Sequence, residues 1–328
     1  MAKMTLSGLQ SFAASYVAAA KQAGTWSETH DNLYGVVDKI GKMVMLDGSF
    51  QDKLPELDGE DLPLGKTIEE YFIDLTLPVD FTPPSATSAT SAIVEGALKP
   101  YLPSVESVSY SYTLGRKIIP TTVPYDNVER GCVDTQAAAN MITKIYQKLT
   151  DSYSLYRYAC KKQLLGNFYA KAATASNAAT LVETISAITD TASGEAFIKK
   201  VKADIENASF ANEGHCLGNT LIGAASPDDL VLYVKKGVMP IIEVDVEAGA
   251  FNGTKVALPV KIKVVDDFGD QSNIVGMLID SRGVKLHRDY HAIRPQENGF
   301  SDFVNMFDHS ENTGFISKYT YFKAYVTA

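Results

Sequence analysis

The sequence predicts an α+β fold in which an extended β-loop precedes one long helix and a mixed domain. Three observations predict it. Residues 67–126 hold strand-like segments around a low-complexity loop, residues 133–172 follow a helical pattern without proline, and short strand patterns recur after residue 211. These later strands are spaced too irregularly for a doubly wound parallel sheet.

The first part of the chain is predicted to be a helical arm. Apolar residues recur at helical spacing in residues 4–23 and again in residues 33–45. Residues 54–66 are polar and contain two prolines and two glycines, a composition that is typical of turns. We therefore expect two helices followed by a turn-rich segment.

Residues 67–126 are predicted to form an extended β-arm. An alternating segment from Ile68 to Val79 is followed by a loop rich in Pro, Ser, Thr and Ala at 83–91, and a second alternating segment covers 105–114. A period of two favours antiparallel strands. Because an isolated hairpin is marginally stable in water, we expect this arm to pack on its own body or on a neighbour.

The rest of the chain is predicted to mix helices and strands. Gly166 is expected to bend or end the long helix, because glycine is a poor helix former. Two more helices are predicted at 178–190 and 194–208. Short apolar or alternating runs predict strands at 230–234, 256–265, 274–280 and 284–288, and residues 314–328 alternate weakly.

Composition and charge exclude several classes of protein. A chain of 328 residues that is 45% hydrophobic and 21% charged is neither disordered nor collagen-like. A net charge of −9 disfavours a protein that grips nucleic acid through its phosphates, although it permits a container for DNA. No apolar run is long enough to span a membrane, and the first twenty residues lack the pattern of a secretion signal.

The cysteines and aromatic residues predict packing roles. Cys132, Cys160 and Cys216 are odd in number and form no CxxC pair, so we expect reduced and mostly buried thiols. Aromatic residues gather at 153–158, 300–307 and 319–325 without interleaved Arg and Lys, which indicates core or subunit contacts rather than base stacking.

No motif for nucleotide binding, zinc hydrolysis or serine hydrolysis is present. Asp266, Asp267 and Asp270 could hold a cation, but they lack the EF-hand spacing, so a solvated turn is the favoured interpretation. The pairs that could act as acid, base or nucleophile are His215–Cys216, His287–His291, Asp204–Glu206 and Glu69–Glu70. Such pairs arise by chance in a chain with 39 acidic residues. No catalytic, cofactor-binding or metal-binding residue is predicted.

The order of these elements resembles the major capsid proteins of tailed bacteriophages, which share the Hong Kong 97 capsid fold. Ser-Pro-Asp-Asp-Leu-Val-Leu at 226–232 and Val-Asp-Val-Glu-Ala-Gly-Ala-Phe-Asn at 244–252 look like the axial domain of small phage capsid proteins, as do 258–260 and 264–268. Ile-Val-Gly-Met-Leu-Ile-Asp-Ser-Arg at 274–282 is similar to the segment that leads back into the peripheral domain. The resemblance covers nearly the whole chain.

The resemblance implies a Hong Kong 97-like capsid fold with four parts. They are an N-terminal helical arm at 1–66, an extended β-loop at 67–126, a peripheral domain with a long spine helix at 127–210 and 286–328, and an axial domain at 211–285. It also implies a structural role without enzyme activity or cofactor. The subunit is expected to assemble through pentamers and hexamers into an icosahedral shell that encloses the phage genome.

The same resemblance implies the partners and the location. The partners are many copies of the chain, a portal protein, decoration proteins and packaged double-stranded DNA, which is contacted weakly; a membrane is not among them. Because the chain is short and begins at Met1, a separate scaffolding protein is expected. Assembly is expected in the host cytoplasm, and the final location is the capsid of the virion.

Three alternatives remain open from the sequence. They are an encapsulin-like nanocompartment shell, an enzyme with an unrecognised polar site, and a tail-tube protein, which would be β-rich without a long helix. Some capsid relatives crosslink a loop lysine to an asparagine of another subunit. Lys99 and Asn305 have the right side chains, but no motif places them, so no crosslink is assigned.

Overall fold

The structure is a computed structural model, and it describes residues 50–62, 67–73, 81–82, 93–94, 105–110, 113–124, 135–241, 258–298 and 303–327. The helices predicted at 4–23 and 33–45 and Lys99 lie outside these residues.

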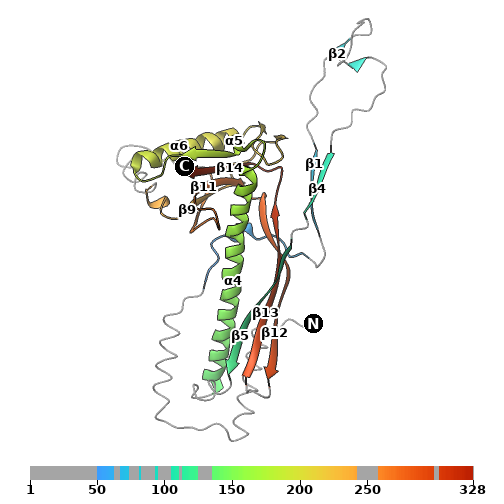
Figure 1. Ribbon diagram of the computed structural model, residues 1–328, viewed down its shortest axis with the longest axis vertical. Helices are drawn as coiled ribbons and strands as arrows, with labels where there is room; N and C mark the ends of the chain where they lie inside the picture. Colours follow the sequence, from blue (N-terminus) through green and yellow to red (C-terminus); the bar gives the residue numbers. More distant parts are fainter. Residues whose placement is uncertain are drawn as a thin grey trace.

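A long helix and a three-stranded sheet form one limb of the molecule. Helix α4 spans Thr135–Ala173, which confirms the long helix that the sequence predicted. The sheet has the antiparallel order β12-β13-β5, and Figure 1 shows it running alongside α4. Its strands are β12 (Val284–Asn298), β13 (Phe303–Ile316) and β5 (Thr113–Pro124).

A mixed five-stranded sheet forms the body, in the order β10-β9-β11-β14-β6. The outer pairs β10–β9 and β14–β6 are parallel, whereas β9, β11 and β14 run antiparallel. The strands are β10 (Lys261–Val265), β9 (Leu230–Lys235), β11 (Ile274–Asp280), β14 (Phe322–Thr327) and β6 (Val182–Ile185). The strands predicted at 230–234 and 274–280 are confirmed. Of the strand predicted at 256–265, residues 261–265 form β10, 258–260 precede it, and 256–257 lie outside the described residues.

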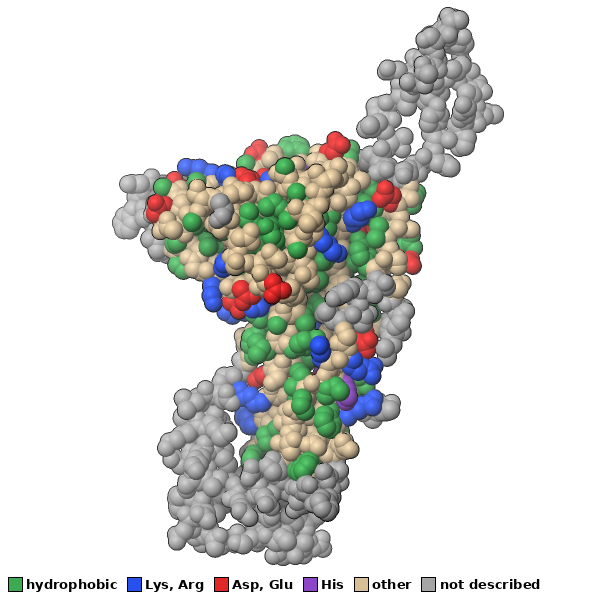
Figure 2. Space-filling view, in the orientation of Figure 1, with side chains coloured by type: hydrophobic (Ala, Val, Ile, Leu, Met, Phe, Trp, Pro, Cys, Tyr) green, Lys and Arg blue, Asp and Glu red, His purple; other side chains and the backbone are tan. Residues whose placement is uncertain are grey.

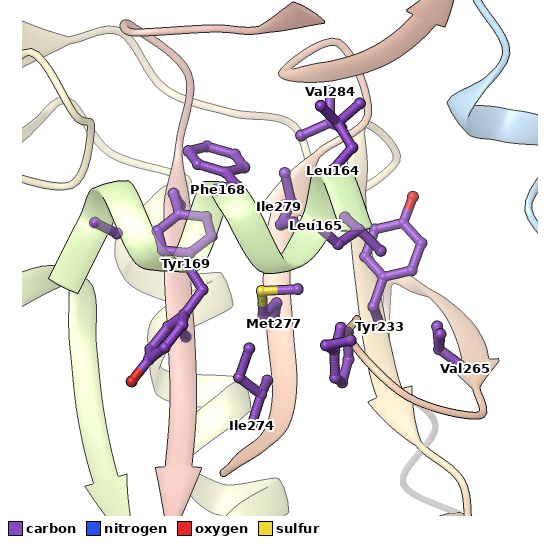
Figure 3. Close-up of a cluster of buried hydrophobic side chains, with 14 of the residues drawn as sticks. Leu164, Leu165, Phe168, Tyr169, Tyr233, Val265, Ile274, Met277, Ile279 and Val284 are labelled. Carbon is purple, nitrogen blue, oxygen red and sulfur yellow. The ribbon is translucent and has the colours of Figure 1, made fainter. Parts of the chain in front are cut away.

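The body sheet is buried on both faces. Along β9, Leu230, Leu232 and Val234 join a core with Phe197 and Val201 of helix α6, which spans Thr191–Ala208. The alternate residues of β9 and β11 face the carboxyl-terminal part of α4 instead. Figure 3 shows that second core, in which Leu165, Phe168 and Tyr169 of α4 pack over Tyr233, Met277 and Ile279. Burial on both faces explains why β9 and β11 read as continuous apolar runs.

An antiparallel hairpin leaves the body on the opposite side from α6 (Figure 1). It consists of β1 (Ile68–Ile73) and β4 (Val105–Tyr110), so the strand pair predicted around the low-complexity loop is confirmed. Farther out along the same arm, β2 (Phe81–Thr82) and β3 (Ile93–Val94) pair in parallel. The remaining short elements are η1 (Pro55–Leu57), α5 (Ala178–Leu181), β7 (Asn212–Glu213) and β8 (Leu221–Ile222).

One predicted element was wrong, one predicted strand was too short, and one strand was not predicted. The helix predicted at 178–190 is the short α5 followed by strand β6, because the branched residues Val182, Thr184 and Ile185 pair with β14. The strand predicted at 284–288 continues to Asn298. Strand β13 was not predicted at all. Its buried face carries polar residues at Asp308, Ser310 and Asn312, so hydrophobic alternation is lost.

Gly166 neither bends nor ends α4, in contrast to the prediction. The helix continues for seven residues beyond it, to Ala173. A Cβ atom at position 166 would lie 2.4 Å from the carbonyl oxygen of Phe268. The glycine therefore allows the turn that follows β10 to pack directly against the helix.

Candidate functional site

Glu70 fixes the base of the β1–β4 hairpin to the body. Its cross-strand neighbours place it on the inner face of the hairpin, opposite Val108. Oε2 accepts hydrogen bonds from the Tyr110 hydroxyl at 2.7 Å and from the Lys318 backbone N–H at 3.1 Å. Oε1 accepts a further hydrogen bond from the Ser317 hydroxyl. One carboxylate thus joins the hairpin to the segment between β13 and β14.

Tyr319 makes the second contact between the hairpin and the body. Its ring stacks on Phe72 with centroids 4.4 Å apart, and its hydroxyl donates to Glu106 at 2.6 Å. Phe72 and Glu106 are cross-strand partners, so one tyrosine engages both strands. Tyr110 adds an edge-to-face contact with Phe315 at 5.0 Å. Burial, and then the hydrogen bond to Glu70, raises the pKa of Tyr110, so its hydroxyl remains a donor.

The outer face of the same hairpin exposes three large apolar side chains beside the polar Glu69, Ser107 and Ser109. Tyr71, Ile73 and Val105 are 67%, 59% and 60% exposed. Ile73 and Val105 are cross-strand partners, so their side chains lie next to each other on this face. An exposed apolar cluster on an arm without its own core is typical of a surface that a partner covers.

A strap at residues 50–62 is held against α4 by a buried lysine. The side chain of Lys161 is fully buried, and its Nζ donates to Asp52, to the Leu54 carbonyl at 2.8 Å and to Asp58 at 2.8 Å. Leu54 and Leu57 bury completely in the core beside α4. The segment that the sequence described only as turn-rich is therefore firmly anchored.

The strap also covers part of the edge of β12. The Gly59 N–H donates to the Leu286 carbonyl at 3.0 Å, and the Leu62 N–H donates to the Arg288 carbonyl at 2.9 Å. Arg157 of α4 bonds to Asp58 and to the Leu286 carbonyl, so helix, strap and strand meet at one guanidinium.

The acidic turn after β10 also binds α4, beside the strap. Lys162 Nζ lies 2.9 Å from Asp266 and 2.7 Å from Asp267, and Gln163 donates to Asp270 at 3.0 Å. Burial would raise the pKa of Asp266, but hydrogen bonds from Lys162 and Tyr158 outweigh it and hold this pKa at about 2. Within the described ranges, no three His, Cys, Asp or Glu side chains gather as metal ligands. The turn thus contacts the helix and is not simply solvated.

The structure places His215 and Cys216 in separate packing environments. The His215 ring stacks on Tyr321 with centroids 5.4 Å apart, and burial, followed by the charge of Lys323, lowers its pKa. The thiol of Cys216 is buried and lies 3.6 Å from the Thr220 carbonyl. The two side chains do not form a nucleophile–base pair.

The two histidines of β12 have different neighbours. Nδ1 of His287 lies 2.9 Å from the Glu60 carbonyl, in the strap. His291 stacks on Tyr153 of α4, and its Nε2 lies 2.9 Å from Asp308. The two residues lie four apart in the extended strand β12, which spans about 13 Å, so the rings do not converge.

The candidate acidic pairs are also separated by the structure. Asp204 is buried and accepts from the Tyr325 hydroxyl at 2.7 Å, whereas Glu206 is exposed. Glu69 is on the outer face of the hairpin and bonds to Tyr71, whereas Glu70 is on the inner face. Asn305 accepts from the Thr122 hydroxyl at 2.7 Å.

Sequence reasoning missed the residues that hold the junctions together. Glu70 was considered only as one member of the acidic pair Glu69–Glu70, which was attributed to chance. Asp52, Asp58 and Lys161 were not predicted to form a contact. A usable signal was present in the strap, where Leu54 and Leu57 lie between two aspartates in a segment otherwise read as polar. None of the helices in the described part of the chain is long and apolar enough to cross a membrane.

Comparison with known proteins identifies relatives among phage capsid proteins. A family model for Phi29-like phage major capsid proteins matches residues 4–325. The major capsid proteins of Bacillus phages PZA and B103 are each 21% identical to the chain, over 88% and 90% of its length. The alignments cover 62% and 63% of those two proteins, so the chain spans less than two thirds of the curated relatives that it matches.

Solved capsid structures share the fold at low sequence identity. The capsid of Staphylococcus phage Andhra superposes with a TM-score of 0.66 at 14% identity, covering 87% of this chain and 86% of that chain. The mature capsid of bacteriophage PhiM1 gives 0.57 at 10% identity, and the capsid of cyanophage P-SCSP1u gives 0.56 at 9%. In both cases 86% of this chain and 90% of the other are covered.

The chain therefore has the α+β Hong Kong 97 capsid fold that the sequence predicted. Because the family model spans nearly all of its residues, the chain belongs to the family of Phi29-like phage major capsid proteins.

Proposed function

We propose that this chain is the major structural subunit of a tailed-phage capsid, and that many copies close into an icosahedral shell around the genome. The observation that carries the proposal is the hairpin, whose outer face exposes Tyr71, Ile73 and Val105 without a core beneath them. A neighbouring copy that covers this face would remove the apolar surface from water. Membership of the capsid family supports the same conclusion.

The four-part division of the chain is part of this proposal. Residues 1–66 would be the arm, 67–126 the extended loop, 127–210 with 286–328 the peripheral domain, and 211–285 the axial domain. The placement of α4 along the β12-β13-β5 sheet supports a stiff peripheral limb. Strand β14 hydrogen-bonds to β11, so the proposed peripheral and axial domains share one sheet.

The proposed partners follow from assembly and charge. Pentamers and hexamers of this chain would form in the host cytoplasm with a separate scaffolding protein, and a portal protein and decoration proteins would join the shell. Weak contact with packaged DNA is supported by the net charge of −9. Figure 2 shows acidic and basic side chains intermixed among the described residues of the visible face. The virion capsid is the proposed location.

An enzyme is a weaker proposal, because the candidate polar pairs lie apart and have packing partners. An encapsulin-like shell shares the geometry argued above, and it would differ by binding a cargo peptide on its inner surface. The capsid proposal is favoured because the family model describes a phage protein.

The test is to examine the purified chain by negative-stain microscopy and analytical ultracentrifugation, at rising concentration and with a crowding polymer. Particles, pentamers or hexamers are expected. A double variant, Ile73→Asp with Val105→Asp, is expected to keep the fold but to lose assembly. Phe210→Asp is the matched control, because Phe210 is equally exposed but follows α6.

Two results contradict the proposal. A wild-type chain that stays strictly monomeric under both conditions, and also in the presence of the scaffolding protein, is not a shell subunit. If the Phe210 variant loses assembly as completely as the double variant, the outer face of the hairpin is not the specific contact.

A further inference from the structure

We propose that Glu70 sets the angle at which the β1–β4 hairpin leaves the body, and that this angle determines the curvature of the assembled shell. The second half of this inference rests on the proposed shell function. The first half concerns the single chain and can be tested without assembly.

Among the described residues, no backbone hydrogen bond joins the hairpin to either larger sheet, although β4 continues along the chain into β5 of the limb sheet after two residues. Within these residues, strands β1 and β4 pair only with each other, as a separate two-stranded sheet. Apart from this short covalent link, the orientation of the hairpin depends on side chains of the inner face. Among these, Glu70 bonds to the body through both of its carboxylate oxygens. Three donors converge on it, one from the hairpin and two from the body.

The body side of this contact is itself firmly held. The Ser317 N–H donates to the Gly283 carbonyl at 2.7 Å, and the Lys318 carbonyl accepts from the Gly218 N–H at 2.8 Å. The Ser317 hydroxyl also accepts from the Tyr319 N–H at 3.1 Å, and Ser317 is almost fully buried. Because the receiving segment is fixed from two directions, the contact with Glu70 transmits a defined orientation to the hairpin.

The contact with Tyr319 does not fix the angle alone. A stacked ring pair such as Phe72 and Tyr319 tolerates sliding and rotation, because the attraction between rings is broad in geometry. The hydrogen bond from Tyr319 to Glu106 lies farther along the hairpin from Tyr110 than the Glu70 contact does. With Glu70 in place, the hairpin is held at two separate points, and rotation about either one is blocked.

The hairpin acts as a lever. Six residues of β-strand span roughly 20 Å, and β2 lies farther out still in Figure 1. A small rotation at Glu70 therefore produces a large displacement of the outer part of the arm. If that part contacts a neighbouring copy, the angle at the base fixes the tilt between copies, which is the local curvature of the shell.

The test compares Glu70→Ala with Glu69→Ala, a matched control on the outer face of the same strand. Among the described residues, Glu69 bonds to Tyr71, two positions along the same strand. Tyr110→Phe removes one donor and is expected to have a smaller effect of the same kind. Particle diameters are measured by electron microscopy. The expected result for Glu70→Ala is loss of the single narrow diameter peak, with irregular or open shells, while the Glu69 variant keeps the wild-type peak.

A second measurement tests the angle of the hairpin on the unassembled chain. Spin labels on Ser107→Cys and Glu206→Cys, in a chain whose three native cysteines are replaced by alanine, report the distance from hairpin to body. The unassembled Glu70→Ala chain is expected to lose the narrow distance distribution of the wild type. An unchanged distribution overturns the inference, even if the variant forms no particles.

The outcomes separate the two claims. Glu70→Ala shells with the wild-type diameter peak overturn the link to curvature. A wild-type chain that forms no shells even with the scaffolding protein refutes the proposed function and with it the link to curvature. The distance measurement alone then decides whether Glu70 sets the hairpin angle.

Discussion

Lys161 shows how one buried charge can hold a whole segment. Its ammonium group is shielded from water and neutralised by Asp52 and Asp58 of the strap. Replacing it with Met keeps the length of the side chain but leaves two carboxylates without a cation. Because these carboxylates are partly exposed, we expect Lys161→Met to lower the free energy of unfolding by about 2–3 kcal/mol, less than for a fully buried pair.

Urea unfolding of the unassembled chain measures this loss. Lys199→Met is the control, because Lys199 is exposed and pairs with Glu195 at 3.3 Å across one helical turn. Such surface pairs contribute about 0.5 kcal/mol or less. Equal effects at both positions would show that burial of Lys161 is not what stabilises the strap.

Replacing Gly166 with alanine is expected to destabilise the chain, although helix propensity alone predicts that it would stabilise α4. Alanine in a helix is favoured over glycine by about 1 kcal/mol. At this position the new Cβ would meet the Phe268 carbonyl, which is backbone and cannot rotate away. We expect Gly166→Ala to lower the free energy of unfolding by roughly 1–3 kcal/mol. Gly115→Ala, where nothing lies within 4 Å, is the matched control and should be nearly neutral in the same assay.

The junction between α4 and the acidic turn predicts a dependence on acid. The pKa of Asp266 is lowered to about 2 in the folded chain, whereas an unfolded aspartate titrates near 3.9. A lowered folded pKa stabilises the chain above the unfolded value, and this contribution disappears as the pH falls from about 4 to about 2. Because the carboxylate is partly exposed, the contribution is expected to be about 1 kcal/mol or less.

Asp266→Asn tests this expectation. The variant should be less stable than the wild type at pH 7, and the difference should vanish near pH 2, as followed by urea unfolding at several pH values. A difference that stays constant over this range would show that the Lys162 contact is not electrostatic in origin.

The elements that were predictable are those whose pattern reflects local geometry. Strands β9 and β11 are apolar throughout because both of their faces are covered, and α4 lacks helix-breaking proline over its length. The failures have tertiary causes. Residues 182–185 form a strand because β14 offers a pairing edge, and β13 is a strand although the middle of its covered face is polar.

The junctions were harder to predict than the elements for a physical reason. Glu70 and Ser317 are 247 positions apart in the sequence, and Lys161 and Asp52 are 109 apart. Each residue taken alone is an ordinary surface type. Only the folded chain brings the donors and acceptors together. The sequence marks at most one side of a junction, as in the strap, where Leu54 and Leu57 lie between two aspartates, and it does not mark the partner on the other side.

The whole molecule combines a closed body with open surfaces. The body sheet has α4 on one face and α6 on the other, so its strands are satisfied within the chain. Among the described residues, the limb sheet has α4 on one face only, and on the other face Ile118 of β5 is 52% exposed. The body sheet therefore stabilises the fold of the single chain. The open face of the limb sheet and the outer face of the hairpin are exposed surfaces that we expect a neighbouring copy to cover.

Adjacent residues of β5 test this division. Ile118 points away from α4, whereas Ile119 pairs with the buried Asp308 on the covered face. We expect Ile118→Glu to change the free energy of unfolding by less than about 0.5 kcal/mol but to reduce the yield of particles in sedimentation. We expect Ile119→Glu to cost about 2 kcal/mol or more, because it brings a second carboxylate close to Asp308. If the Ile118→Glu variant assembled like the wild type, the open face of the limb would not be a contact between subunits. If this variant unfolded as easily as Ile119→Glu, that face would belong to the core of the single chain.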